Sequence, residues 1–389
     1  MCNYNMLGDD CMRGKIGILT INDYSNYGNR LQNYALQEVL KSFDYEVETI
    51  VQDRPVLSGR SRSIIMKIKD FIISSKGNRL QSIKSRIQSK MYSQVRKEKI
   101  SNLRAFTSKY INEASVRISI NDIPEFVAQE YTFFVTGSDQ VWNPNFGFAN
   151  SIDFLEFAPT GKRIAYAPSF GVSNLPQELE ENFRSYLQQI DHLSVRENTG
   201  AVIIEDLIGI NVPVLVDPTL LLDKKKWKSI TQVDINKPNQ EYLLTYILGE
   251  IPPDVKEAIN LLSKKYNLKL VNLADLKDSK RYVVGPAEFL DYINSAKLII
   301  TNSFHGAVFS ILFERPFIVA DRLGNSPSMN SRIDTLLKKL NLLDRKWEMV
   351  KKSKEYFNSD FSNTPRLLEY ERNKALMFLK KALNIRDNK

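Results

Sequence analysis

The chain of 389 residues contains only two cysteines and two histidines. Both cysteines, Cys2 and Cys11, precede the first expected strand, where they make no disulfide framework and no metal-ligand spacing. We therefore expect no metal site. So few cysteines are typical of proteins from a reducing compartment, and we expect a cytoplasmic location.

Long hydrophobic runs are absent as well. Although 43% of the residues are hydrophobic, no window approaches the roughly 20 apolar residues of a membrane-spanning helix. Residues 1–10 are polar and acidic and lack the apolar stretch of a signal peptide. Neither a membrane span nor a secretory leader is expected from these patterns.

Nucleic-acid motifs are a third absence, because the chain has no helix-turn-helix, zinc-finger or RNP signature. The net charge is nevertheless +9, and much of it lies between Arg60 and Arg104, where Asp70 and Glu98 are the only acids. We expect no nucleic-acid partner and interpret this stretch first as a solvated helical face. The alternative hypothesis is peripheral contact with an anionic membrane, where each basic residue contributes ~1 kcal/mol.

Apolar runs alternate with helical patterns along most of the chain, which predicts an α/β protein of two doubly wound parallel domains. We expect a first domain over residues 1–228, with a basic insertion of two or three helices at about 58–110. A polar bridge at 227–241 precedes a second domain over residues 229–363. In residues 364–389, a helix over Thr364–Leu383 is expected to pack back on the first domain. The expected strands include Lys15–Ile21, Tyr45–Val51, Tyr131–Thr136, Arg163–Ala167, Val212–Val216, Tyr242–Leu248, Lys269–Leu273 and Phe317–Ala320.

The most informative stretch is Leu298–Asp321, which predicts a strand, a turn, a helix and a second strand. Asn302 and Ser303 are cap-type residues, so the helix should begin directly after them. Gly306 allows a close approach of the backbone. The turn would present His305 and free N–H groups at the carboxyl edge of a sheet, where α/β proteins bind ligands and helix N-termini attract anions.

Polar segments follow three other expected strands. Residues 22–29 form a turn-rich loop without a full G-x-G-x-x-G motif, so a dinucleotide cofactor is not expected. Gly28 in this loop either is required only for the geometry of the turn or faces a ligand. Residues 137–144, which follow the strand at 131–136, are rich in hydrogen-bond donors and acceptors and are interpreted as part of a functional site. The alternative is a structural Asx-turn in which Trp142 is a packing anchor.

Five motifs now resemble one family, in order and in spacing, over roughly residues 14–340. They are Asn26-Tyr-Gly-Asn-Arg-Leu-Gln32, Gly137-Ser-Asp-Gln-Val-Trp-Asn-Pro144, Ser194-Val-Arg-Glu197, Val216-Asp-Pro-Thr219 and Thr301-Asn-Ser-Phe-His-Gly306. The family is the polysaccharide pyruvyl transferases. The resemblance implies a GT-B-like fold, with two Rossmann-like domains facing across a cleft. It also implies transfer of the enolpyruvyl skeleton of phosphoenolpyruvate to a saccharide, with no cofactor.

The resemblance assigns roles to particular residues. His305 is the implied general acid, since the methylene carbon of phosphoenolpyruvate must accept a proton. Arg196 is the implied partner of the anionic donor; its alternative is a structural ion pair with Glu197 or Asp191. The other donor-binding candidates are Asn302, Ser303, Gly306 and Glu314. The acceptor or cleft candidates are Tyr27, Gly28, Asn29, Gln32, Gly137, Ser138, Asp139, Gln140, Trp142, Asn143 and Ser169.

Two features conflict with a simple transfer of the family's mechanism. A helix N-terminus disfavours an imidazolium, so a protonated His305 needs compensation, which we expect from the substrate's anionic groups. Characterised members also place an arginine two residues before this histidine, where the chain has Ser303. The lost charge-assisted hydrogen bond is worth ~1.5–3 kcal/mol. The candidates to supply the missing positive charge are Arg30, Lys280, Arg281 and Arg322.

Alternative functions remain open from the sequence. Glu314 is similar to a glutamate of GT-B glycosyltransferases, which keeps a nucleotide-sugar donor in consideration. A sugar-binding relative that lost its donor site is the non-enzyme hypothesis, which Ser303 would permit. The acceptor in either case is a nucleotide- or lipid-linked saccharide.

Overall fold

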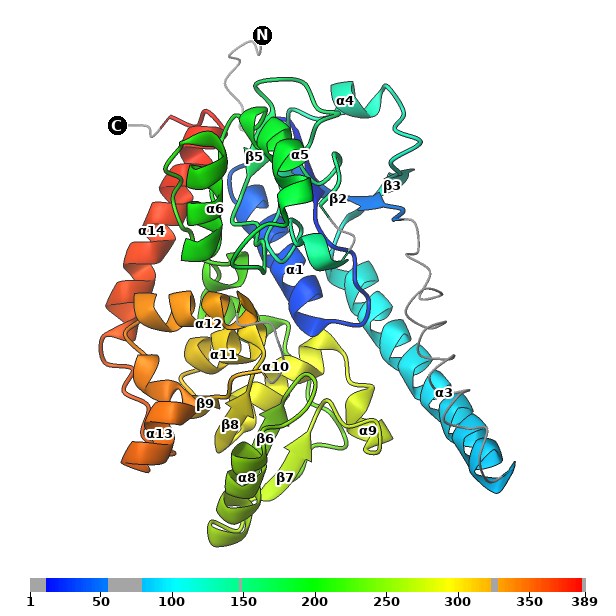
Figure 1. Cartoon of the computed structure of the whole chain (residues 1–389), viewed down its shortest axis with the longest axis vertical. Helices are drawn as coiled ribbons and strands as arrows, with labels where there is room; N and C mark the ends of the chain where they lie inside the picture. The colour runs from blue at the N-terminus through cyan, green and yellow to red at the C-terminus, as the bar shows by residue number, and fades with distance from the viewer. Residues whose placement is uncertain (1–11, 55–78, 147–148, 323–327, 387–389) are drawn as a thin grey trace, which may run out of the picture.

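Two parallel β-sheets, one in each half of the chain, form the framework of the molecule (Figure 1). The computed structural model describes residues 12–54, 79–146, 149–322 and 328–386. The strand order is β3-β2-β1-β4-β5 in the first sheet and β7-β6-β8-β9 in the second. The predicted α/β class with two parallel sheets is confirmed. The strands are β1 Lys15–Leu19, β2 Glu46–Gln52, β3 Glu113–Ile118, β4 Phe133–Thr136, β5 Arg163–Ala165, β6 Tyr242–Tyr246, β7 Lys269–Asn272, β8 Leu298–Thr301 and β9 Phe317–Val319.

Helices connect these strands and cover the sheets. The α-helices are α1 Tyr27–Lys41, α3 Arg79–Tyr110, α4 Val127–Glu130, α5 Gln177–Gln188, α6 Asn198–Ile208, α7 Lys224–Ser229, α8 Pro253–Lys265, α9 Ser279–Tyr282, α10 Pro286–Ser295, α11 Phe304–Leu312, α12 Ser328–Lys339, α13 Trp347–Ser353 and α14 Thr364–Ala382. Short 3-10 turns lie at Pro144–Phe146, Pro218–Leu220 and Leu343–Arg345.

The two halves share a continuous apolar core. Trp227 of α7 is fully buried, and its ring lies 5.6 Å from that of Tyr34 in α1 and 4.9 Å from that of Phe309 in α11. Tyr27, at the start of α1, stacks on Phe289 of α10 with centroids 4.5 Å apart. The predicted polar bridge at 227–241 is therefore wrong at its first residue, since Trp227 joins the cores of both halves.

Helix α14 runs along one side of the molecule past both halves (Figure 1). Its Arg372 donates to the carbonyls of Leu220 and Leu222 at 2.6 and 2.9 Å. Near its end, the carbonyl of Leu383 accepts a hydrogen bond from the Tyr45 hydroxyl. These contacts tie the end of the chain to elements of the first half.

Several elements differ from the sequence prediction. Of the two or three helices expected at about 58–110, the described residues show α3 over 79–110, and the part before Arg79 lies outside the described ranges. Strand β3 was not predicted because it lies at the sheet edge and alternates polar with apolar residues weakly. Helix α5 was not predicted because it buries only Phe183 and Leu187. The expected strand at Val212–Val216 is reduced to one bridge between Val195 and Val214, since Pro213 has no N–H to donate.

Some predictions concern residues outside the described ranges. They include Cys2 and Cys11, the insertion before Arg79, and the part of the basic stretch that precedes Arg79. Among the helices of the described ranges, none combines the length and apolarity that crossing a bilayer requires.

Candidate active site

The imidazole of His305 lies where the two halves meet. Helix α11 begins directly after β8, and the Ser303 hydroxyl caps it by accepting from the Gly306 N–H at 3.3 Å. The cap places His305 in the first helical turn, with only 7% of its surface exposed. The ring packs against Gly28 in α1, where an added Cβ would overlap Nδ1. Gly28 is therefore required for this close approach, because any other side chain would displace the imidazole.

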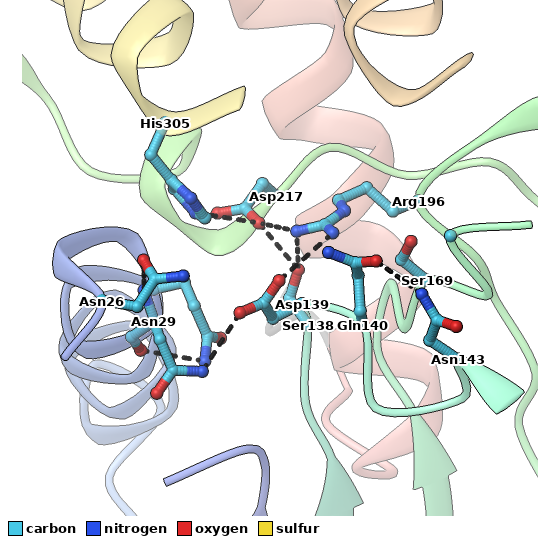
Figure 2. Close-up of polar contacts among 12 residues, drawn as sticks. Asn26, Asn29, Ser138, Asp139, Gln140, Asn143, Ser169, Arg196, Asp217 and His305 are labelled. Atoms are coloured by element: carbon cyan, nitrogen blue, oxygen red, sulfur yellow. Dashed lines mark hydrogen bonds and ion pairs between the residues drawn. The ribbon is translucent and has the colours of Figure 1, made fainter. Parts of the chain in front are cut away.

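Asp217 joins the two halves at this point. Its buried carboxylate lies 3.7 Å from His305 Nε2, and Figure 2 shows it between this imidazole and the guanidinium of Arg196. Oδ2 accepts hydrogen bonds from Arg196 Nη1 and the Ser138 hydroxyl, each at 2.7 Å. Oδ1 accepts from the N–H and hydroxyl of Thr219 at 3.0 and 2.7 Å. The motif Val216-Asp-Pro-Thr219 therefore supplies a site residue that sequence reasoning did not single out.

Arg196 is buried and pairs with Asp217 and, at 3.6 Å, with Asp139. Its guanidinium also lies over the Phe304 ring, 4.7 Å from the centroid. The expected alternative, a structural pair with Glu197 or Asp191, is wrong: Glu197 instead accepts from Ser169 and nearby backbone N–H groups. Nε and Nη2 of Arg196 have no hydrogen-bond partner among the described residues.

A second buried arginine, Arg332, was missed by sequence reasoning. It lies in α12, is 5% exposed, and its Nε has no hydrogen-bond partner in the described part of the chain. Arg332 and Arg196 line one small cavity. Burial, followed by repulsion from Arg196, lowers the pKa of Arg332 to about 10. The only sequence signal was a basic residue at a buried position of an amphipathic helix.

The charges of the cluster support one another. Burial would raise the pKa of Asp217, but the positive charges of His305 and Arg196 and the hydrogen bonds hold this pKa well below its ordinary value. The pKa of Asp139 is lowered against burial in the same way, chiefly by Arg196. Both carboxylates are ionised at neutral pH. The compensation that an imidazolium needs at a helix N-terminus is thus present within the protein, in Asp217.

The loop after β4 contributes several of the predicted cleft residues. Asp139, in a left-handed conformation with φ of 72°, accepts from Asn29 Nδ2 at 3.1 Å. Ser138 bonds Asp217, as described above. Gln32 of α1 donates to Thr20 at 2.9 Å, and its buried Oε1 has no partner among the described residues. The structure therefore brings Asn29, Ser138 and Asp139 together with Asp217, Arg196 and His305 (Figure 2).

Other predicted site residues have structural partners. Both amide atoms of Asn302 bond the backbone of Leu248, at 2.7 and 3.0 Å. Trp142 is fully buried and stacks on Phe154, as the packing alternative predicts. The other predicted donor-binding and cleft residues contact neighbours within the fold. Gly306 lies against Thr301, Gly137 against Leu36, Tyr27 against Phe289, Gln140 against Asn143 and Ser169 against Glu197.

Glu314 is not part of this cluster. It follows α11 at the opposite end from His305, ~13 Å along the helix axis at 1.5 Å per residue, and pairs with Lys224 at the surface. Glu314 therefore lies apart from His305 and Asp217, beyond the end of α11 at Leu312.

The four expected substitutes for the family arginine lie in different places. Arg30 is fully buried and donates to the Ile21 carbonyl and to Asn29, so it is committed to the fold. Arg281 pairs with Asp278, and Lys280 lines a separate cavity. Arg322 is close enough to Arg332 to affect its pKa.

The second histidine lies elsewhere. His192 forms a backbone bridge beside β5, and burial lowers the pKa of its imidazole. Within the described ranges, no three histidine, cysteine, aspartate or glutamate side chains are grouped so that they could hold a metal ion.

Comparison with known families identifies the class. The family model of the polysaccharide pyruvyl transferases matches residues 26–322. This match spans most of the chain and includes all five motifs. The chain therefore belongs to the polysaccharide pyruvyl transferase family and is a transferase. No curated protein sequence matches the chain significantly.

Comparison with solved structures gives matches that cover nearly the whole chain at low sequence identity. A co-structure of S. aureus MnaA with UDP is 14% identical, with 97% of this chain and 98% of that chain covered and a TM-score of 0.47. A UDP-GlcNAc 2-epimerase from Methanocaldococcus jannaschii is 11% identical, with coverage of 92% and 99% and a TM-score of 0.43. The E. coli ADP-heptose lps heptosyltransferase II is 12% identical, with coverage of 95% and 98% and a TM-score of 0.35.

The contact between Gly28 and His305 can be tested by adding one methyl group. In Gly28→Ala the new Cβ must displace the imidazole from Asp217, because it overlaps the ring. We expect the NMR chemical shifts of the His305 ring, assigned in a His192→Asn background, to differ from those of the parent. Gly200→Ala is the control, since its Cβ would lie 3.2 Å from the Phe170 side chain, which can move slightly. Unchanged chemical shifts of the His305 ring in Gly28→Ala would contradict this geometry.

The charge of Asp217 should govern part of the acid stability. Because its pKa is lowered in the folded protein, the unfolded state binds more protons in acid, and the stabilisation present above about pH 4 is lost as the pH falls. Asp217→Asn should lower the free energy of unfolding at pH 7 by about 3–5 kcal/mol, since Arg196 loses its partner. Below pH 4 its dependence on pH should be shallower than in the parent.

Urea denaturation between pH 3 and pH 7 measures both effects. Asp206→Asn, at an exposed position on α6, is the matched control and should follow the parent curve. Equal slopes for the parent and Asp217→Asn would show that Asp217 does not contribute to the acid dependence.

Proposed function

We propose that this protein transfers the enolpyruvyl skeleton of phosphoenolpyruvate to a saccharide, forming a cyclic pyruvate ketal and releasing phosphate. The acceptor would be nucleotide- or lipid-linked, in the assembly of a surface or capsular polysaccharide at the cytoplasmic side of the membrane. The main support is the buried pair of His305 and Asp217, in which Nε2 has no hydrogen-bond partner among the described residues. An ionised carboxylate beside an uncommitted imidazole nitrogen favours a general acid.

The proposed reaction balances with this single acid. His305 gives its proton to the methylene carbon of phosphoenolpyruvate, which becomes the methyl group, while C2 gains oxocarbenium character. One acceptor hydroxyl then adds to C2, phosphate leaves, and a second hydroxyl closes the ketal. Of the two hydroxyl protons, one restores the imidazolium and one leaves on phosphate. Asp217 acts as a positioning residue, since it orients the imidazole and stabilises its positive charge.

The donor carries close to three negative charges, and we propose that Arg196 and Arg332 bind them. Both guanidinium groups are buried and have nitrogens without a hydrogen-bond partner among the described residues. Arg196 is already paired with Asp217 and Asp139, whereas Arg332 has no ion pair among the described residues. Because an unpaired buried charge is costly, the charge of Arg332 beside Arg196 at one cavity favours an anionic ligand. Arg332 would thus supply from α12 the charge that Ser303 lacks.

Donor binding on this proposal needs more room than the described conformation gives. The cavity that Arg196 and Arg332 line has a volume of about 10 Å³, enough for about one water molecule. We infer that the two halves separate slightly when the donor enters. Loss of buried contacts between α1 and the second half would then accompany binding.

Incubation of the purified protein with phosphoenolpyruvate and saccharide acceptors tests the function. We expect phosphate release together with a carboxyethylidene mass gain on the acceptor. His305→Ala should lower kcat by at least ~10²-fold, the lower range for a general acid, and His192→Ala should not. Release of nucleoside diphosphate from a nucleotide sugar would instead indicate a glycosyltransferase. Acceptor binding without either reaction would indicate a sugar-binding relative.

Arg332→Met tests the donor site separately. We expect the KM for phosphoenolpyruvate to rise ~10- to 150-fold, which corresponds to the ~1.5–3 kcal/mol of one charge-assisted hydrogen bond. Without ligand the variant should be as stable as the parent, because Arg332 makes no hydrogen bond with Nε that could be lost. Arg345→Met is the control: Arg345 is equally buried but bonds Asp344 and the Glu355 carbonyl. It should lose stability and keep the parent KM. An unchanged KM in Arg332→Met would exclude Arg332 from the donor site.

A further inference from the structure

A cavity of about 370 Å³ lies between α3 and the second half of the molecule, apart from the His305 cluster. Three segments line it: the last turns of α3, the linker after α7, and the segment from α9 to the start of α10. In Figure 1 this is the region where the end of α3 passes α9 and α10. Its volume falls in the range of small-molecule sites, about 300–1,000 Å³.

One wall of the cavity is a connected set of polar groups. In the amide orientation of Gln232 that satisfies both neighbours, Nε2 donates to Glu288 Oε1 at 3.2 Å and Oε1 accepts from Lys109 Nζ at 3.1 Å. Asp234 accepts from the Tyr292 hydroxyl at 2.6 Å. Burial raises the pKa of Glu288. Asp234 Oδ1 also accepts from the backbone N–H and the side-chain amide of Asn236, at 3.1 and 3.2 Å. The lone pairs that remain on Asp234 Oδ2 and on Glu288, together with the N–H groups of Lys109, are available to a polar ligand.

Aromatic side chains also line the cavity. Phe106 and Tyr110 of α3 are among them, with ring centroids 4.8 Å apart. A sugar ring has the complementary character, since its hydroxyls lie around the edge and its C–H groups form apolar faces. A lining that combines carboxylates, an amide and aromatic rings is therefore suited to a saccharide.

The cavity also lies along the same sheet edge as His305. The segment from α9 to α10 follows the carboxyl end of β7, and His305 follows that of β8. Tyr27 links the two places. Its ring stacks on Phe289, next to Glu288, while its neighbour Gly28 contacts the imidazole. Both places therefore follow carboxyl ends of strands in the second sheet.

We propose that this cavity binds an uncharged sugar of the saccharide acceptor, remote from the hydroxyls that receive the pyruvyl group. This assignment rests on the proposed function. Charge favours a neutral sugar over a phosphate or nucleotide: Asp234 and Glu288 balance Lys109 and Lys280 around the cavity. A polyanion therefore gains no net attraction, whereas each hydroxyl can donate to a carboxylate or accept from an ammonium group.

Binding to the full chain without donor is the first test. The probes are lactose, maltose and N,N′-diacetylchitobiose, measured by calorimetry and by NMR at up to millimolar concentrations. We expect at least one to bind, Glu288→Gln to raise its Kd at least tenfold, and Ala105→Trp, which fills the cavity from α3, to abolish binding. Glu257→Gln on the exposed face of α8 is the matched control and should bind as the parent does. If no probe binds, or if UDP or pyrophosphate displaces the bound sugar, the assignment is wrong.

Kinetics separate this inference from the proposed function. With a turned-over acceptor, Glu288→Gln should raise the acceptor KM at least tenfold while kcat and the KM for phosphoenolpyruvate stay within twofold of the parent. Pyruvyl transfer with an unchanged acceptor KM in both cavity variants would overturn the cavity assignment and leave the function intact. Sugar binding that the variants abolish, with no phosphate released from phosphoenolpyruvate, would overturn the function and leave the cavity assignment intact.

Discussion

The buried carboxylate of Asp217 is the interaction on which the site depends. It comes from the first half of the chain, where Arg196, Ser138 and Thr219 surround it, and it reaches His305 of the second half. A carboxylate without these partners would be too costly to bury in its ionised form. Because the partners keep it charged, it can orient and stabilise an imidazolium that the N-terminus of α11 disfavours. The proposed acid chemistry and the contact between the halves thus depend on one group.

The apolar core supports this arrangement. Tyr27 of α1 and Trp227 of α7 contact aromatic rings of the second half. Helix α1 also packs against both α10 and α11. Gly28 follows Tyr27 directly, so the packing that locks Tyr27 onto Phe289 also brings the glycine against the imidazole. Displacement of α1 would therefore change the position of His305 relative to Asp217. In this family member, the packing between the halves and the geometry of the His305–Asp217 pair are coupled.

Local patterns predicted the framework well where they were strong. Strand β8, its capped turn and helix α11 follow from the apolar run 298–300 and from Ser303, which does accept a hydrogen bond from the Gly306 N–H. The weak patterns failed. Strand β3 is an edge strand with polar residues, and α5 buries two side chains. Glu314 lies beyond the end of α11 and pairs with Lys224, which no local pattern predicts.

By itself the sequence determined the α/β class, the parallel sheets, the family and the histidine at a sheet edge. These depend on periodicity, capping and spacing, which are properties of neighbouring residues. Only the tertiary structure decided that Arg196 pairs with Asp217, that Gly28 contacts His305, that Asn302 is bound to Leu248, and that Arg332 lies buried beside Arg196. Each of these contacts joins residues far apart in the chain, and burial then fixes which polar atoms find partners and which do not.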